Sequence, residues 1–116
     1  MRTVLEILMA MKDTCDVIYD HIHGIPIEDL IEDMKTIDAC AMRFSTLGNY
    51  AKDLDDIGFF THNRYDWMKY YRFRCRIDHQ YGSAGFDPIF IVGTIDEDLN
   101  RTYDELCSII RLLSSD

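Results

Sequence analysis

The sequence has few of the residues that interrupt regular structure, since its 116 residues include only 2 prolines and 6 glycines. An all-β domain needs a turn signal every ~8–12 residues, and this chain offers too few of them. It also lacks any apolar run near the ~18 residues that a membrane span requires. The stretch 4–11 is interrupted by Glu6 and has no small-residue cleavage site, so we expect neither a signal peptide nor a membrane anchor.

The sequence lacks any CxxC spacing, because its four cysteines, Cys15, Cys40, Cys75 and Cys107, lie far apart. In a chain without a leader peptide, this pattern favours four reduced thiols, most of them buried. We therefore expect a cytoplasmic protein.

Positive charge is also in short supply, since 12 Lys and Arg face 21 Asp and Glu and leave a formal net charge of −9. A protein that binds nucleic acid nonspecifically is usually basic, so nucleic-acid binding by this acidic chain would depend on a local basic patch. The acidic clusters at 28–33, 53–56 and 96–98 are interpreted as solvated faces, with partner docking as the alternative. Hydrophobic residues make up 47% of the chain, which is enough for a core.

Apolar residues recur at helical spacing along most of the chain. The stripes predict a first helix over about 2–21, a short second helix over 26–31, a long third helix over about 37–54, and a fourth from about Tyr65 to 81. Asp87 and Pro88 are interpreted as the N-cap and first residue of one final helix that runs to about 113. Within it, Gly93 would mark a bend or a close contact.

These elements predict a single all-α domain over residues 1–116. We expect an up-and-down bundle of four long or medium helices plus one short helix.

The segment 69–81, KYYRFRCRIDHQY, concentrates positive charge and interleaves it with aromatic residues. Arginine supplies a permanent charge and a fork of donors that matches phosphate. Histidine titrates near neutrality and can carry a proton to or from a hydroxyl. Together these residue types suit chemistry at a phosphodiester.

Arg74, His79 and Tyr81 form an RX4HXY pattern at the end of the fourth predicted helix, which resembles the motif of HepT-like proteins in the HEPN superfamily. The resemblance covers nearly the whole chain. It includes Trp67 at the opening of the motif helix, the small-residue segment LGxxA at 47–51, and a closing helix over 86–113.

The resemblance implies a HEPN-like bundle and a metal-independent endoribonuclease toxin that needs no cofactor, in a type VII-like toxin–antitoxin pair. It implies a homodimer with a composite cleft and a cognate MNT-type nucleotidyltransferase antitoxin that transfers AMP to the motif tyrosine. On this chain His79 would assist the RNA 2′-hydroxyl, Arg74 would stabilise the transition state, and Tyr81 would be modified. Arg72 and Arg76 are interpreted as flanking RNA contacts.

Helix geometry brings only part of this motif together. Arg74 and Tyr81 lie seven residues apart and share a face, whereas His79 lies ~140° round the helix from Arg74. The pair would converge if the helix ended or distorted near Asp78, or if the partner subunit contributed. Two residues depart from the family pattern: Cys75 replaces the usual Asn, and Asp78 replaces a small or apolar residue.

The same residues also have structural interpretations. Arg74 would pair with a nearby acidic group, and His79 would be favoured at a helix end by the macrodipole. Arg72 and Arg76 would be solvated flanks. Two further functions stay open: a catalytically weak HEPN subunit that binds a nucleotidyltransferase and its substrate, and a structural helical adaptor.

Other chemistries have weaker patterns. His21 and His23 are two residues apart and point to different helix faces, so no metal site is expected. Cys75 as a nucleophile lacks an orienting group. No glycine-rich phosphate loop is present, so the chain is not expected to be a nucleotidyltransferase itself.

Overall fold

The computed structural model describes residues 3–81 and 88–115, and the side chains at 80 and 81 lie outside that description. Every regular element in these ranges is a helix, which confirms the predicted all-α class. The helices are α1 (Val4–Ile22), α2 (Ile27–Leu30), α3 (Met34–Asp56), α4 (Met68–Tyr81), α5 (Pro88–Glu97) and α6 (Leu99–Ser114). Within the same ranges, no helix is long and apolar enough to cross a membrane.

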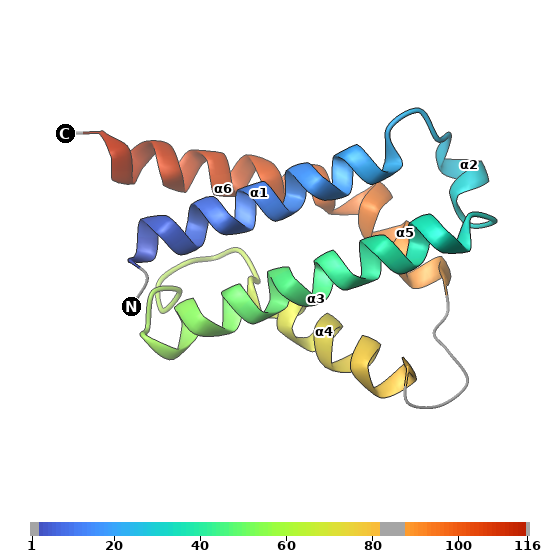
Figure 1. The fold of residues 1–116 in the computed structure, drawn as a ribbon. Coiled ribbons are helices and arrows are strands. Elements are labelled where there is room, and N and C mark those ends of the chain that lie inside the picture. The colour runs from blue at the N-terminus through green and yellow to red at the C-terminus, as the bar shows by residue number, and fades with distance from the viewer. Residues whose placement is uncertain (1–2, 82–87, 116) are drawn as a thin grey trace.

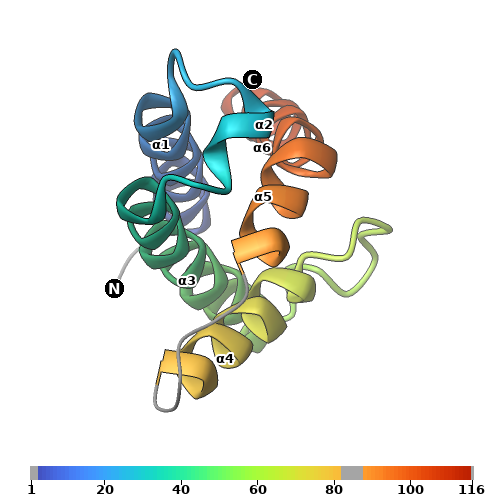
Figure 2. The ribbon, with the colours of Figure 1, turned by 90° about the vertical axis from the view of Figure 1, so that its right-hand side faces the viewer.

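Helix α3 lies at the centre of the molecule (Figure 1) and packs against α1 on one side and α4 on the other. Helix α1 also packs along α6, and α5 contacts both α3 and α6. The chain reverses direction from α1 to α3 and again from α3 to α4. Seen from the end in Figure 2, the helices surround one interior that α2 closes at the near end.

The predicted apolar stripes form this interior. Leu8, Met11, Cys15 and Ile18 of α1 are fully buried. They face a matching stripe on α3, which consists of Ile37, Cys40, Ala41, Phe44, Leu47, Ala51 and Leu54. Full burial of each larger aliphatic or aromatic side chain contributes about 1.5–3 kcal/mol, so the contact between α1 and α3 is a principal source of stability.

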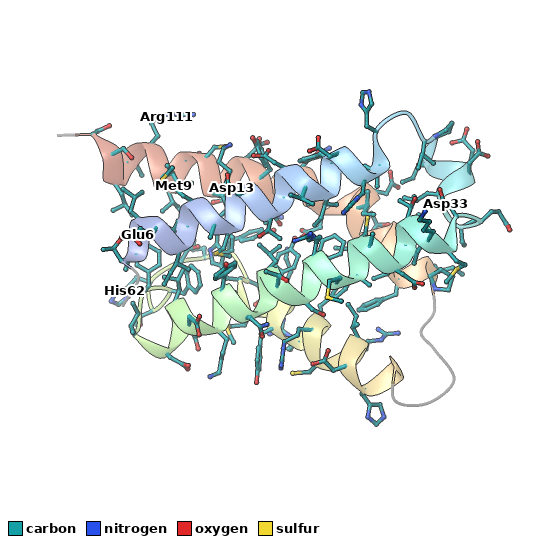
Figure 3. The ribbon with its side chains drawn as sticks, viewed as in Figure 1. Glu6, Met9, Asp13, Asp33, His62 and Arg111 are labelled. Atoms are coloured by element: carbon teal, nitrogen blue, oxygen red, sulfur yellow. The ribbon has the colours of Figure 1, made fainter. Side chains whose placement is uncertain are left out.

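Side-chain caps fix where the two longest helices begin. The Thr3 hydroxyl accepts a hydrogen bond from the Glu6 backbone N–H at 3.1 Å and donates to the Glu6 carboxylate at 3.2 Å. Asp33, labelled in Figure 3 at the start of α3, accepts from the Thr36 N–H at 3.1 Å. Both caps satisfy backbone donors that the first helical turn leaves without partners.

Two predicted helix starts differ from the structure. Helix α4 begins at Met68 instead of near Tyr65, because the Asn63 side chain accepts from the Tyr65 N–H at 2.9 Å and holds the chain in a turn. Pro26 is the N-cap of α2 instead of lying in its first turn, and Ile31 is the C-cap.

The predicted final helix is wrong in one respect, because it is two helices. Asp98 leaves helical geometry (φ −130°), and α6 starts after it. The described residues therefore form five longer helices plus the short α2, one longer helix more than predicted. Pro88 begins α5 as predicted, while Asp87 lies outside the described residues. Gly93 makes no close contact, since no heavy atom lies within 4 Å of the position a Cβ would take.

Candidate functional site

Helix α4 lies unusually close to α3, at Gly48. A Cβ on this glycine would lie 2.3 Å from the Tyr70 carbonyl oxygen and 3.0 Å from the Arg74 Cβ. Only a residue without a side chain fits there without backbone movement. The small-residue segment at 47–51 therefore fixes the distance between α3 and the motif helix.

Burial of one stripe of α4 determines which of its residues face outward. Tyr70, Phe73 and Ile77 are 0%, 6% and 2% exposed, respectively. The Phe44 ring of α3 packs against two of them, with centroids 6.1 Å from Tyr70 and 5.0 Å from Phe73. The charged residues of α4 consequently occupy its two flanks and its outer face.

Arg74 lies on the flank of α4 that faces α3. Its guanidinium group lies 3.4 Å from the Asp78 carboxylate, one turn further along, and its side chain is 34% exposed. The guanidinium carbon also lies 5.9 Å from the centre of the Tyr71 ring. Arg74 is therefore oriented by neighbours on its own helix and remains open to solvent on one side.

His79 is exposed and shares a face with two other basic residues of α4. Arg72, Arg76 and His79 follow one another at i, i+4 and i+7, the spacing of one helix face. We call these three residues the basic strip. Arg72 forms an ion pair with Asp66, and the Arg76 guanidinium carbon lies 3.9 Å from the centre of the Phe90 ring of α5.

The structure therefore does not bring Arg74 and His79 together within one chain. Helix α4 continues without interruption to Tyr81, as predicted, so no helix end or distortion near Asp78 brings the two residues together. The two residues stay ~140° apart round the helix. Tyr81 follows Arg74 by two helical turns on the same face, although its side chain lies outside the described residues.

The cysteines divide into two kinds. Burial, the largest cause, raises the pKa of the Cys15 thiol to about 12 and that of Cys40 to about 11. Cys107 is half-buried, and Cys75 is exposed on the outer face of α4, where the family resemblance leads one to expect Asn. Fewer of the thiols are buried than predicted, and all four are free.

A polar cluster between α4 and α6 was not predicted. The Asp98 carboxylate accepts hydrogen bonds from Lys69 Nζ at 2.6 Å, from the Tyr70 hydroxyl, from the Tyr65 hydroxyl at 3.2 Å and from the Thr102 hydroxyl at 3.1 Å. We call these five residues the Asp98 cluster. The interpretation of 96–98 as a solvated acidic face is wrong for Asp98, because this carboxylate turns inward to meet four donors.

These hydrogen bonds change how the cluster ionises. Burial raises the pKa of the Asp98 carboxyl, but the donors Lys69 and Tyr70 outweigh burial and leave that pKa below its ordinary value. Burial and the bond to Asp98 raise the pKa of the Tyr70 hydroxyl. At neutral pH the cluster thus pairs an ionised Asp98 carboxylate with a neutral Tyr70 hydroxyl.

Metal ligands do not gather in the part of the chain that the structure describes, since no group of three or more His, Cys, Asp or Glu side chains lies close enough to hold an ion there. Comparison with protein-family models, with curated proteins and with solved structures found no match.

Proposed function

We propose that this chain is a HepT-like RNA endonuclease with a HEPN-like bundle, which works without a metal as a homodimer. The observation that carries the proposal is the basic strip, which concentrates Arg72, Arg76 and His79 on one exposed face of α4 in a protein of net charge −9. Arginine side chains neutralise RNA phosphates, and an exposed histidine beside them is placed to move a proton.

In the proposed reaction, His79 takes the proton of an RNA 2′-hydroxyl while that oxygen attacks the adjacent phosphorus. The new O2′–P bond forms as the P–O5′ bond breaks, which leaves a cyclic phosphate and a 5′-hydroxyl that takes up a proton. Arg74 stabilises the negative charge that accumulates on the phosphorus oxygens. No step requires a cofactor.

The proposed site is composite, because Arg74 and His79 lie on different sides of one continuous helix. A second copy whose motif helix faces the first would supply the missing residue of each pair. Two-fold dimers of this kind use the same surface twice.

Inactivation in this proposal comes from an MNT-type nucleotidyltransferase that transfers AMP to Tyr81. Tyr81 lies two turns after Arg74 on the same helix face. An added nucleotide would bring bulk and negative charge to the residue that must contact the RNA phosphate.

A second candidate function is a catalytically weak subunit that binds a nucleotidyltransferase and its substrate. One observation favours it: the Arg74 guanidinium is already occupied by Asp78 at 3.4 Å. In an active enzyme that carboxylate must release the arginine when RNA binds.

The test is induced expression without the partner, comparing the wild type with His79→Ala and Tyr81→Phe. His62→Ala is the control, since His62 is an exposed histidine in the loop before α4. We expect growth arrest and RNA fragments from the wild type and His62→Ala, and neither from His79→Ala. Tyr81→Phe should stay toxic and escape rescue by the partner. Folded wild-type protein that neither arrests growth nor cleaves RNA would favour the docking subunit.

A further inference from the structure

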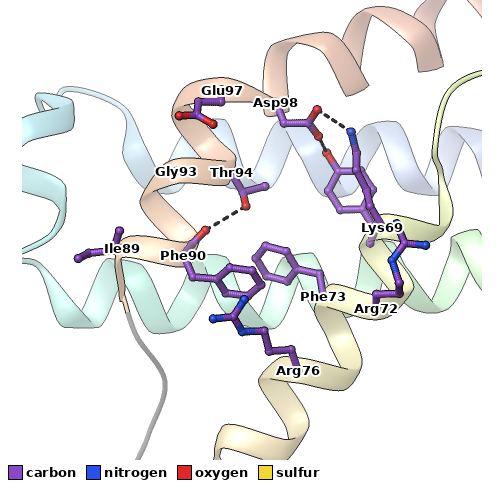
Figure 4. Close-up of a pocket in the computed structure, with 11 residues that line it drawn as sticks. Lys69, Arg72, Phe73, Arg76, Ile89, Phe90, Gly93, Thr94, Glu97 and Asp98 are labelled. Carbon is purple, nitrogen blue, oxygen red and sulfur yellow. Dashed lines mark hydrogen bonds and ion pairs between the residues drawn. The ribbon is translucent and has the colours of Figure 1, made fainter.

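A pocket of about 600 Å³ lies between α4 and α5, on the side of α4 that carries Arg72 and Arg76 (Figure 4). Ligand sites typically have volumes of ~300–1,000 Å³. The pocket combines aromatic rings with three basic and two acidic side chains. It is therefore more basic than the chain as a whole.

Aromatic rings form one wall of this pocket. Phe73 and Phe90 are stacked with centroids 4.2 Å apart and planes 21° from parallel. The Arg76 guanidinium lies over Phe90 and lines the same pocket. Stacked rings and an arginine plane are the surfaces on which proteins hold unpaired bases.

The opposite wall contains Gly93, inside helix α5. Glycine in a helix interior costs about 1 kcal/mol relative to alanine, and here no neighbour requires it, because nothing lies within 4 Å of a Cβ at this position. Any side chain at residue 93 would instead take up pocket space. The glycine keeps the volume open at a cost in helix stability.

Polar groups lie at the end of the pocket away from Phe73 and Phe90 (Figure 4). The ion pair of Lys69 and Asp98, at 2.6 Å, is part of the lining. Glu97 and Thr94 lie on the α5 side. Such donors and acceptors suit the edge of a nucleobase.

The pocket opens next to the basic strip. Arg76 lines it and lies three residues before His79, so the two side chains are neighbours on the helix surface, with Cβ atoms ~5–6 Å apart. A ligand whose ring enters the pocket would place its phosphate within reach of both.

We propose that this pocket binds one nucleotide of single-stranded RNA, with its base stacked on the Arg76 guanidinium above Phe90 and its phosphate at Arg72, beside His79. The inference rests on the proposed function, since it names the subsite that presents RNA to the histidine.

The test measures fluorescence anisotropy of a short labelled single-stranded RNA that carries 2′-O-methyl groups and cannot be cleaved by 2′-hydroxyl attack. Gly93→Trp fills the pocket, Phe90→Ala removes a ring, and Asp96→Trp adds the same bulk at an exposed position of α5. We expect Gly93→Trp and Phe90→Ala to weaken binding by at least about tenfold, and Asp96→Trp to bind like the wild type. Circular dichroism confirms that each variant is folded.

Folded Gly93→Trp and Phe90→Ala proteins that bind this RNA as tightly as Asp96→Trp would overturn the subsite. The subsite would also be overturned if Gly93→Trp bound RNA normally but no longer bound free AMP. The same holds if Gly93→Trp bound RNA normally but no longer bound the nucleotidyltransferase. Cleavage of unmodified RNA by the wild type is scored separately. If RNA binding depends on the pocket but the wild type does not cleave RNA, the nuclease proposal is rejected and the subsite is retained. If the wild type cleaves RNA but binding does not depend on the pocket, the subsite is rejected and the nuclease proposal is retained.

Discussion

The guanidinium group of Arg74 lies 3.4 Å from the carboxylate of Asp78, one turn further along α4. The pair is well exposed, so it contributes at most about 1 kcal/mol to folding. In the proposed function its significance lies in competition, because an RNA phosphate that needs Arg74 would have to displace Asp78.

Asp78→Asn should therefore raise the rate of RNA cleavage several-fold, since it frees the guanidinium and removes a negative charge near the substrate. The free energy of unfolding should change by less than about 1 kcal/mol. The measurement is initial rate on a labelled single-stranded RNA. Asp56→Asn is the matched control, because it breaks the Lys52–Asp56 pair of the same i, i+4 type on α3. An unchanged or lower rate in Asp78→Asn would contradict the competition.

The proposed composite site predicts complementation between two inactive variants. Arg74→Ala and His79→Ala should each be inactive alone. Mixed as unfolded chains and refolded together in equal amounts, they should recover about one quarter of wild-type activity, because half of the dimers are mixed and each mixed dimer has one intact site. A site formed within one chain gives no recovery, and that result would reject the composite arrangement.

Gly48 and Gly93 are predicted to respond in opposite ways to the same substitution. Gly48→Ala places a Cβ 2.3 Å from a backbone oxygen of α4, and should destabilise the protein by about 1–3 kcal/mol. Gly93→Ala meets no atom and should stabilise it by up to about 1 kcal/mol. Urea unfolding followed by circular dichroism measures both. Equal effects at the two positions would contradict the close approach of α3 and α4.

Asp98 should make stability depend on pH. Its pKa is lowered in the folded state, so its contribution is present above the unfolded pKa of about 3.9 and is lost as the pH falls through the folded pKa. Asp98→Asn should lower the free energy of unfolding by about 2 kcal/mol at pH 7. In acid, the difference in unfolding free energy between this variant and the wild type should become smaller. Asp96→Asn, two residues earlier and exposed, should change the free energy of unfolding little at either pH. If the difference in unfolding free energy between Asp98→Asn and the wild type stayed constant with pH, Asp98 would act by packing alone.

The helices were predictable where one face is apolar, because the stripes on α1 and α3 depend only on local spacing. The break at Asp98 was not, since a carboxylate within a helical pattern indicates a solvated face. Its hydrogen-bond partners on α4 and before it lie 28 to 33 residues earlier in the chain. The only local signal was Thr102, a polar residue one turn later within an apolar stripe.

The motif shows a similar division. Spacing alone gave both the angle between Arg74 and His79 and the extent of α4 to Tyr81. The pocket depends on how α5 lies against α4, which no local pattern encodes. Gly93 was a local sign of the pocket. Its place within a helix predicts a bend or a close contact, whereas in the structure it leaves an opening.

In the proposed function, the basic strip has a further consequence for the encounter with RNA. An approaching polyanion meets a molecule of net charge −9, so most collision directions are repulsive at long range and only those toward α4 lead to capture. Screening acts over about 10 Å at 0.1 M salt, and it removes the distant repulsion before it weakens the close contacts. The association rate of RNA is therefore expected to pass through a maximum at intermediate ionic strength, instead of falling steadily as it does for a uniformly basic protein.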